Sequence, residues 1–264
     1  MDLGLRGKTA VVTGSTAGIG LAIAEALAAE GARVTVNGRT EERVSAAIAA
    51  VRSRAPGADV RGIAADLGTA AGAETLIAAA PDADVLVNNV GIFEARAFPE
   101  ITDAEWARIL EVNLLSGVRL SRHHLPRMLG RGFGRILFIS SESGVQIPAE
   151  MIHYGVTKTA QLGLSRGLAE LTRGTHVTVN AILAGPTRSE GVGQFVESLA
   201  RHRGETAAEV ERDFFRNARP TSLLQRFETP EEIAALVAFV ASERASAVNG
   251  AALRVDGGVV RAIV

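Results

Sequence analysis

The chain has 264 residues, of which 47% are hydrophobic, and its 28 basic and 29 acidic residues leave a formal net charge of −1. This composition excludes a disordered chain, and it offers no charge excess for a nucleic-acid or anionic membrane partner. The absence of cysteine excludes disulfides, a thiol nucleophile and a cysteine-based zinc site. With no secretory signal and no apolar run long enough to span a bilayer, we expect a cytoplasmic protein.

Short apolar, β-branched runs alternate with segments of helical periodicity along the whole chain. The predicted strands are 8–12, 32–37, 60–64, 84–87, 134–140, 176–183 and 251–255. The predicted helices are 18–30, 40–54, 70–80, 102–129 (interrupted at Pro126), 152–171 and 229–241. Continuously apolar strands that alternate with helices are typical of a parallel sheet covered on both faces. We therefore predict a doubly wound, Rossmann-type α/β sheet of about seven strands in a single domain, 1–264.

One segment, 185–227, interrupts this alternation, because it is long, charged and free of strands. An insertion of this length is often functional, and a substrate lid and a plain helical surface insertion remain equally open. The residues expected to wall a substrate pocket are Ser143, Gln146, Ile147, Met151, Phe195, Leu199, Phe214 and Phe215. Four arginines of the segment could bind an acid or a phosphate, but we expect them to be solvated: Arg188, Arg203, Arg216 and Arg219.

A glycine-rich stretch, 13–20, lies between the first strand and the first helix. Gly14 permits a tight turn, Gly18 lets the backbone approach a pyrophosphate, and Gly20 allows close helix–strand packing. Free N–H groups at the helix N-terminus then bind the phosphate charge. The cofactor contacts expected from this stretch are Gly14, Ser15, Thr16, Gly18, Ile19 and Gly20.

The end of the second strand bears on the choice of cofactor. An acid is usual there when the cofactor is NAD, but the chain has Asn37 followed by Gly38 and Arg39. A planar guanidinium at Arg39 suits a ribose 2′-phosphate, and the alternative is an ordinary solvated arginine. Ala17 stands where a second basic residue would strengthen the case. We predict that NADP(H) is favoured over NAD(H).

Polar residues also follow the third and fourth strands. Asp66, with Leu67 after it, can accept a hydrogen bond from an adenine amino group, and it can also cap the next helix. Asn88 and Gly91 lie where the fourth strand ends. They suit a cofactor edge, and a turn in which asparagine binds its own backbone is the alternative.

Tyr154 is the only tyrosine, and Lys158 lies one helical turn later. An ammonium group there favours the ionised phenol, which makes a usable acid and base near neutral pH. The alternative is a surface pair on an amphipathic helix. Ser141 follows a strand at the sheet edge where ligands bind. Asn113 lies within an apolar helical stretch, and either a structural hydrogen bond or a relay role explains it.

Taken together, these motifs resemble the short-chain dehydrogenase/reductase family across nearly the whole chain. The matching residues are Thr13, Gly14, Gly18, Gly20, Asn88, Asn89, Gly91, Asn113, Ser141, Tyr154, Lys158, Asn180 and 255–258. The resemblance implies that Tyr154 is the general acid/base and that Ser141 binds the substrate oxygen. It implies that Lys158 binds the nicotinamide ribose, and that Asn113 holds a water of a proton relay.

The resemblance is incomplete after the sixth strand. Where the family commonly has Pro-Gly, this chain has Gly185 and then Pro186 and Thr187, and Ser189 stands for the usual threonine. Gly185 and Thr187 are still expected to contact the cofactor. The resemblance also implies a homo-oligomer, a tetramer or dimer, that pairs through the long helices 102–129 and 152–171.

The sequence thus predicts an NADP(H)-dependent oxidoreductase that interconverts a small-molecule ketone and a secondary alcohol. Acyl-thioester and sugar or polyol substrates both remain open. The alternative function is a catalytically idle dinucleotide-binding redox sensor or scaffold. A metal enzyme is not expected, because no histidine pair has metal-ligand spacing on a helix. His123 and His124 are expected at the surface.

Overall fold

The computed structural model describes residues 2–263, and the side chains of 194 and 195, and so the predicted wall residue Phe195, lie outside its described part. Its strands are β1 (Thr9–Val12), β2 (Arg33–Gly38), β3 (Val60–Ala64), β4 (Val85–Asn88), β5 (Gly134–Ser141), β6 (Val177–Ala184) and β7 (Ala252–Val255). They form one parallel sheet in the order β3-β2-β1-β4-β5-β6-β7. The predicted doubly wound α/β fold is confirmed. The strand order reverses between β1 and β4, which is where ligands bind in open sheets of this kind.

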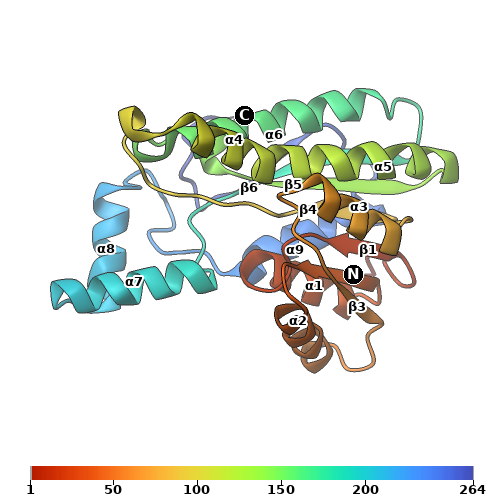
Figure 1. The fold of residues 1–264 in the computed structure, drawn as a ribbon, viewed down its shortest axis with the longest axis horizontal. Helices are drawn as coiled ribbons and strands as arrows, with labels where there is room; N and C mark the ends of the chain where they lie inside the picture. Colours follow the sequence, from red (N-terminus) through yellow and green to blue (C-terminus); the bar gives the residue numbers. More distant parts are fainter. Residues whose placement is uncertain (1, 264) are drawn as a thin grey trace.

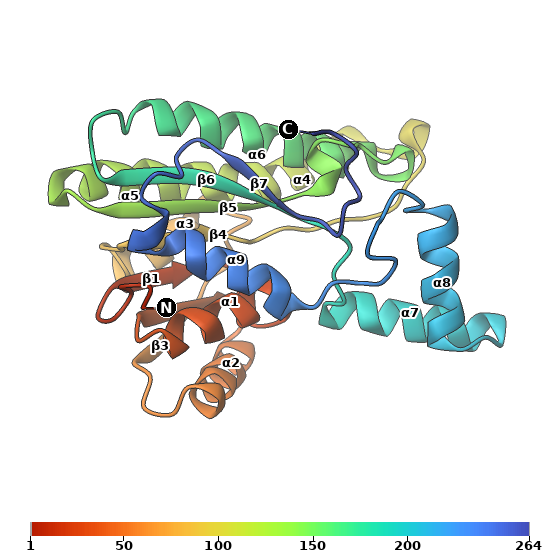
Figure 2. The ribbon, with the colours of Figure 1, turned by 180° about the vertical axis from the view of Figure 1, so that it is seen from behind.

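Helices cover both faces of the sheet. They are α1 (Gly18–Ala29), α2 (Glu41–Arg54), α3 (Ala70–Ala79), α4 (Asp103–Leu110), α5 (Ser116–Arg131), α6 (Ile152–Glu170), α7 (Glu190–Arg203), α8 (Ala207–Asn217) and α9 (Pro230–Ala241). Figure 1 shows α3, α4, α5 and α6 on one side of the sheet, and Figure 2 shows α1, α2 and α9 on the other. None of the helices in the described part is long and apolar enough to cross a membrane.

The core consists of two apolar layers, one on each face of the sheet. Val12, Val36 and Ile182 face α1 and α9, and Leu86 and Phe138 face the layer beneath α3 and α5. All five are at most 1% exposed. Burial on both faces explains why the strands are continuously apolar. It also makes the sheet a rigid base whose carboxyl edge carries the loops described below.

The predicted helix 102–129 is two helices joined by a wider turn. α4 ends at Leu110, a π-helical turn spans Glu111–Leu115, and α5 continues to Arg131. Pro126 does not interrupt α5. It lies on the solvent side, as does Arg122 one turn earlier, so the carbonyl that loses its amide partner can be hydrated. The π turn is centred on Asn113, and such turns are frequent at functional sites.

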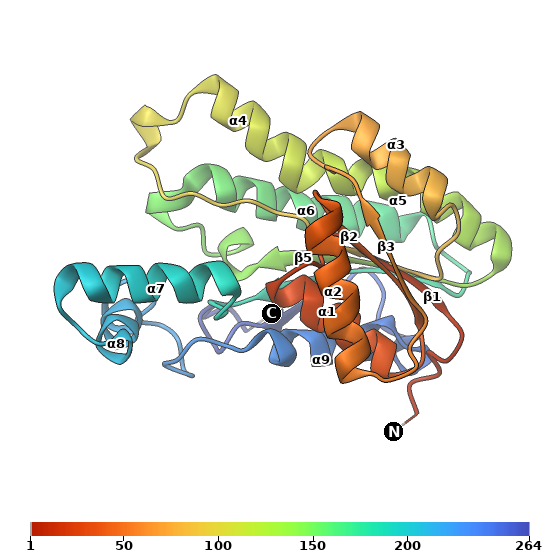
Figure 3. The same ribbon diagram turned by 60° about the horizontal axis from the view of Figure 1, so that its bottom comes forward.

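The segment 185–227 contains α7 and α8, which project from the body beyond the carboxyl edge of the sheet (Figure 3). Its apolar residues form a small core of their own. The ring centroids of Phe214 and Phe227 stack 5.1 Å apart, and Phe215 is 1% exposed in the same cluster with Leu199. The prediction that Phe215 lines a pocket is therefore wrong, because its side chain is buried between the two helices. Phe214 and Leu199 pack in the same cluster but are partly exposed, so their place in a pocket wall stays a prediction.

His124 is also placed differently from the prediction. It is 1% exposed and lies on the inner face of α5. Both ring nitrogens are buried and have no hydrogen-bond partner in the described part. Burial lowers the pKa of His124 to about 4, with the neighbouring His123 adding to the effect. The neutral imidazole therefore packs in the core rather than meeting solvent.

Candidate active site

The glycine-rich stretch forms the turn between β1 and α1. Gly14 has φ +58, a left-handed conformation that favours glycine. A Cβ atom at Gly20 would lie 2.4 Å from the Gly14 carbonyl oxygen, so only glycine lets the helix start this close to the strand. The N-cap residue of α1, Ala17, makes no side-chain cap, and the first turn holds no acid. The N–H groups at this helix end therefore remain available to an anion.

The side chains in and around this turn form hydrogen bonds to the neighbouring backbone. Ser15 is buried, and its hydroxyl donates to the Val12 carbonyl (2.7 Å) while it accepts from the Asn37 N–H (2.9 Å). Asn89 donates to the Thr13 and Gly14 carbonyls, at 2.9 and 3.0 Å. The Ser15 hydroxyl therefore braces the loop, and a contact of Ser15 with the cofactor stays a prediction. Ile19 likewise packs against the core beside α9.

Arg39 is exposed at the carboxyl end of β2. The preceding Gly38 lies against the loop, since a Cβ atom there would come 2.3 Å from the Thr16 methyl group. The strand end that carries Arg39 is thus held beside the glycine turn. One turn into α2, Arg43 pairs with Glu190 at the start of α7 (3.0 Å), so this end of α2 also reaches the insertion.

The residues at the ends of β3 and β4 differ in how accessible their side chains are to a ligand. Asp66 is exposed and accepts from the Gly68 N–H (3.0 Å), while Thr69 caps α3. The helix-cap interpretation of Asp66 is therefore wrong. Leu67 is 2% exposed and packs in the core, so its side chain does not reach a cofactor. Asn88 ends β4 at the carboxyl edge, but its side chain points into the body under α5, where it donates to the Ser121 hydroxyl (3.3 Å).

The structure brings the four predicted catalytic residues close to one another. Ser141 ends β5 at the carboxyl edge, and its hydroxyl lies near enough to the Tyr154 phenol to lower the pKa of that phenol. Tyr154 and Lys158 occupy the first two turns of α6, and the ammonium Nζ lies 5.5 Å from the phenol ring centroid. Lys158 is 4% exposed and donates to the Ile139 carbonyl at 2.8 Å. A Cβ atom at Gly91 would lie 3.6 Å from Nζ, so the loop after β4 closes the same site.

The pKa values of Tyr154 and Lys158 differ from those expected from the sequence. Burial raises the pKa of Tyr154 to about 12, against the lowering effects of the Ser141 hydroxyl and the Arg219 charge. Burial also lowers the pKa of Lys158 to about 8. The expected net lowering of the Tyr154 pKa is therefore wrong, because the desolvation of the phenol outweighs the charges that favour its ionised form. The phenol is held neutral, and the lysine titrates near neutral pH.

Asn113 is fixed on every side. Its side chain accepts from the Ile92 N–H (2.8 Å) and donates to the Ile92 carbonyl and to the Thr157 hydroxyl. Its backbone carbonyl, in the π turn, accepts from the Gln161 amide at 2.6 Å. These contacts support the structural role of Asn113, which ties the loop after β4 to the helix of Tyr154. Gln161 was not singled out from the sequence.

The loop after β6 is organised by an acid that sequence reasoning missed. Glu228 is 3% exposed, and it accepts from the Gly185 N–H (3.1 Å). Burial raises the pKa of Glu228 to about 7, and the charge of Asp256 adds to it. Thr187 donates to the Gly185 carbonyl (2.9 Å), and Ser189 caps α7. A Cβ atom at Gly18 would lie 3.1 Å from the Ser189 Cβ, so this loop meets the glycine turn.

A buried ion pair beside Ser141 was also missed. Arg219 was expected to be solvated, but it is 7% exposed and its Nε lies 2.9 Å from Glu142. One feature of the sequence could have indicated this ion pair, because Glu142 directly follows Ser141 at the end of the strand. No periodicity distinguishes Arg219 from the other arginines of the insertion, which are exposed.

Comparison with known proteins agrees with this geometry. Residues 8–200 match the family model described as short chain dehydrogenase. The chain is 50% identical over 263 residues to the oxidoreductase YvaG of Bacillus subtilis, with 100% of both chains covered. It is 37% identical to a D-beta-hydroxybutyrate dehydrogenase of Cupriavidus necator, covering 96% of this chain and 98% of the relative. The crystal structure of L-sorbose reductase from Gluconobacter frateurii, complexed with NADPH and L-sorbose, superposes with a TM-score of 0.92 at 33% identity and covers 100% of both chains. The chain therefore belongs to the short-chain dehydrogenase/reductase family and is an oxidoreductase of that family.

Proposed function

We propose that this enzyme uses a nicotinamide dinucleotide, NADP(H) in preference to NAD(H), to interconvert a ketone and a secondary alcohol. The observation that carries the proposal is the phenol of Tyr154 beside the Ser141 hydroxyl at the carboxyl edge of the sheet, where the N-terminus of α1 also lies without a side-chain cap. The L-sorbose reductase structure, which contains NADPH and a ketose, supports the cofactor and substrate class. Pairing through α5 and α6 in a homo-oligomer stays a prediction.

Each of these residues would have a separate role in the reaction. When bound, the dinucleotide supplies or accepts the hydride at the carbonyl carbon. The phosphates would lie at the N-terminus of α1, and the nicotinamide end beside Lys158 and Gly185. Tyr154, neutral below pH of about 12, donates its proton to the carbonyl oxygen in reduction. The Ser141 hydroxyl accepts from the Ser143 N–H (3.1 Å), which fixes its position, and it would donate to the substrate oxygen.

Turnover of a carbonyl panel tests the proposal. The purified chain is incubated with NADPH or NADH and with short ketones, ketoses and 3-oxoacyl thioesters, and oxidation of the reduced nicotinamide is followed by absorbance. We expect turnover of at least one class, with NADPH preferred. Tight binding of either dinucleotide without turnover across the panel would overturn the proposal in favour of an idle redox sensor or scaffold.

Replacement of Arg39 by leucine is expected to raise the KM for NADPH by about tenfold or more and to leave the KM for NADH nearly unchanged. The reason is the loss of a charge-assisted hydrogen bond to the ribose 2′-phosphate, which is worth about 1.5–3 kcal/mol. Steady-state kinetics with each dinucleotide measures the effect. Arg33→Leu, at the exposed opposite end of β2, is the matched control. An equal change in both KM values would refute the role of Arg39.

The pH profile of reduction should report Lys158. Burial lowers the pKa of Lys158 to about 8, so the ammonium form is lost as pH rises through that value. The ammonium offsets the charge that develops on Tyr154 as its proton leaves, and the neutral amine does not. The kcat/KM for reduction is therefore expected to decline above pH of about 8, approaching tenfold per pH unit. A profile that is flat from pH of about 7 to 10 would contradict this assignment.

A further inference from the structure

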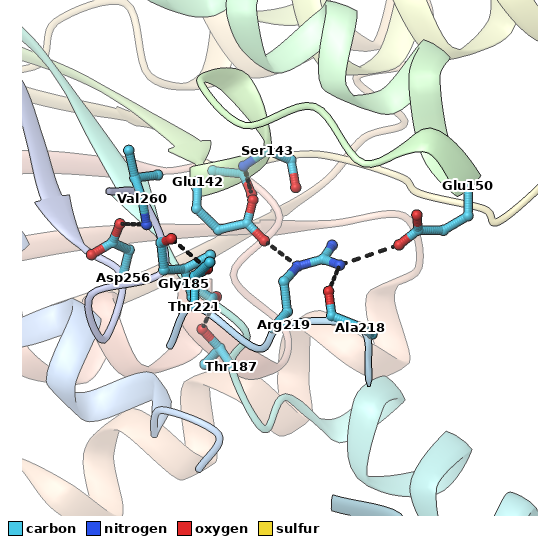
Figure 4. A network of polar contacts seen from close by, with 12 residues as sticks. Glu142, Ser143, Glu150, Gly185, Thr187, Ala218, Arg219, Thr221, Asp256 and Val260 are labelled. Carbon is cyan, nitrogen blue, oxygen red and sulfur yellow. Dashed lines mark hydrogen bonds and ion pairs between the residues drawn. The ribbon is translucent and has the colours of Figure 1, made fainter. Parts of the chain in front are cut away.

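Arg219 lies where the insertion returns to the body, immediately after α8. Its Nε donates to Glu142 Oε1 at 2.9 Å, and its Nη1 donates to Glu150 Oε1 at 3.2 Å and to the Ala218 carbonyl at 2.8 Å. Figure 4 shows the guanidinium between the two carboxylates, with the remaining nitrogen directed away from both. The residue is 7% exposed and Glu142 is 3% exposed, so this is a buried ion pair.

The pair lies at the reacting end of the active site. Glu142 follows Ser141 directly, and Glu150 lies four residues before Tyr154. Both charges act on the phenol, since Glu142 raises and Arg219 lowers the pKa of Tyr154. The insertion thereby contributes one charged side chain to the neighbourhood of the two residues that hold the carbonyl oxygen.

One part of the guanidinium is unused. A guanidinium has five N–H donors, and three of them are taken by Glu142, Glu150 and the Ala218 carbonyl. Nη2 makes no hydrogen bond to any residue in the described range, and it is not among the atoms sealed from solvent. A buried charged group with two unmatched donors is costly unless an acceptor comes to it. Solvent reaches Nη2, so water can accept from it in the free enzyme, and a substrate oxygen can take the place of that water.

The charges around Arg219 restrict what that atom can be. Two carboxylates already face the single positive charge, so a carboxylate or phosphate of a substrate would meet a net negative surround. A saturated acyl chain would leave Nη2 unmatched. A neutral hydroxyl oxygen satisfies the donor without adding charge. Resting on the function proposed above, we propose that Arg219 is a substrate-binding residue whose Nη2 donates to a hydroxyl group of a neutral, hydroxylated ketone such as a ketose.

Matched substrates test this inference. The kcat/KM of the wild-type enzyme with NADPH is measured for a hydroxylated ketone, its deoxy analogue of equal length and the corresponding 3-oxo acid. A charge-assisted hydrogen bond predicts a preference for the hydroxylated ketone over the deoxy analogue of about tenfold to a hundredfold. A wild-type enzyme that prefers the deoxy ketone or the 3-oxo acid overturns the inference and leaves the proposed function intact. Failure to reduce any carbonyl overturns both.

A conservative variant separates binding from folding. Arg219→Lys keeps the positive charge for Glu142 but lacks the second nitrogen of the fork. We expect the preference for the hydroxylated ketone to fall about tenfold, chiefly through its KM, while Arg203→Lys at the exposed end of α7 keeps the wild-type ratio. A merely structural role would lower turnover of both ketones equally, and an unchanged ratio in Arg219→Lys would overturn the inference. If that variant does not fold, the wild-type comparison still decides.

Discussion

Replacing Tyr154 with phenylalanine is expected to lower kcat for carbonyl reduction by about 10²–10⁴-fold. The change removes only the phenolic oxygen, and no other tyrosine in the chain can take over its role. The ring keeps its edge contact with Phe93, at 6.1 Å between centroids, so packing is nearly unaltered. A proton donor held neutral by burial is lost from the point where the carbonyl oxygen must be protonated.

The control for this variant is binding measured independently of turnover. Trp106 is the only tryptophan, and its ring lies 6.0 Å from His153, the residue before Tyr154. Quenching of its fluorescence by NADPH should be similar in the wild type and in Tyr154→Phe, together with an unchanged Tm. A variant that retains more than about a tenth of wild-type kcat would show that another group protonates the oxygen.

The fold was largely predictable because each signal was local. Continuous apolar strands such as β1 and β4, and the glycine turn between β1 and α1, predicted the parallel sheet and its ligand-binding edge. The predicted strand ends differ from the observed ones by at most one residue; β5, for example, extends to Ser141. The π turn at Asn113 was not predicted, because helical periodicity continues through it and only the geometry shows the extra residue.

The catalytic residues were predicted as a set, but their chemistry depended on burial. From the sequence, Lys158 one turn after Tyr154 indicated a stronger phenol. In the structure, desolvation raises the pKa of Tyr154 and lowers that of Lys158. Spacing along a helix gives the distance between two groups and not their exposure to water, and here exposure decides the direction of both shifts.

Contacts between distant segments were beyond the reach of local patterns. Arg219 and Glu142 are 77 residues apart, and Glu228 lies 43 residues after Gly185. Each of these acids and this arginine looked like an ordinary surface charge. Only the return of the insertion to the sheet edge buries them beside the site, which is why the substrate-facing part of the enzyme was the least predictable.

Replacing Glu228 with glutamine is expected to stabilise the protein at pH 8 by up to about 3 kcal/mol. Burial raises the pKa of Glu228 to about 7, above the ordinary glutamate value of 4.5 that applies to the unfolded chain. Between these two values the folded state binds a proton that the unfolded state does not, so wild-type stability falls as pH rises from about 5 to about 7. Above pH 7 the buried carboxylate is charged, and its cost is fully present.

Glutamine removes this cost and keeps the contact that the acid makes. Its carboxamide oxygen can accept from the Gly185 N–H, as Glu228 Oε2 does at 3.1 Å. The other oxygen, Oε1, is buried without a partner in the described part, so no ion pair is lost.

Thermal unfolding at pH 5 and pH 8 should therefore show a higher Tm for Glu228→Gln at pH 8 and a much smaller difference at pH 5. The control Glu231→Gln, on the exposed face of α9, should match the wild type at both pH values. A loss at pH 8 would show that the acid stabilises the loop as an ion, and an equal gain at both pH values would show that titration of Glu228 is not the source of the gain. The expected gain would instead mean that the enzyme keeps a destabilising acid next to Gly185, where the loop is expected to meet the cofactor, as occurs when stability is given up at a functional site.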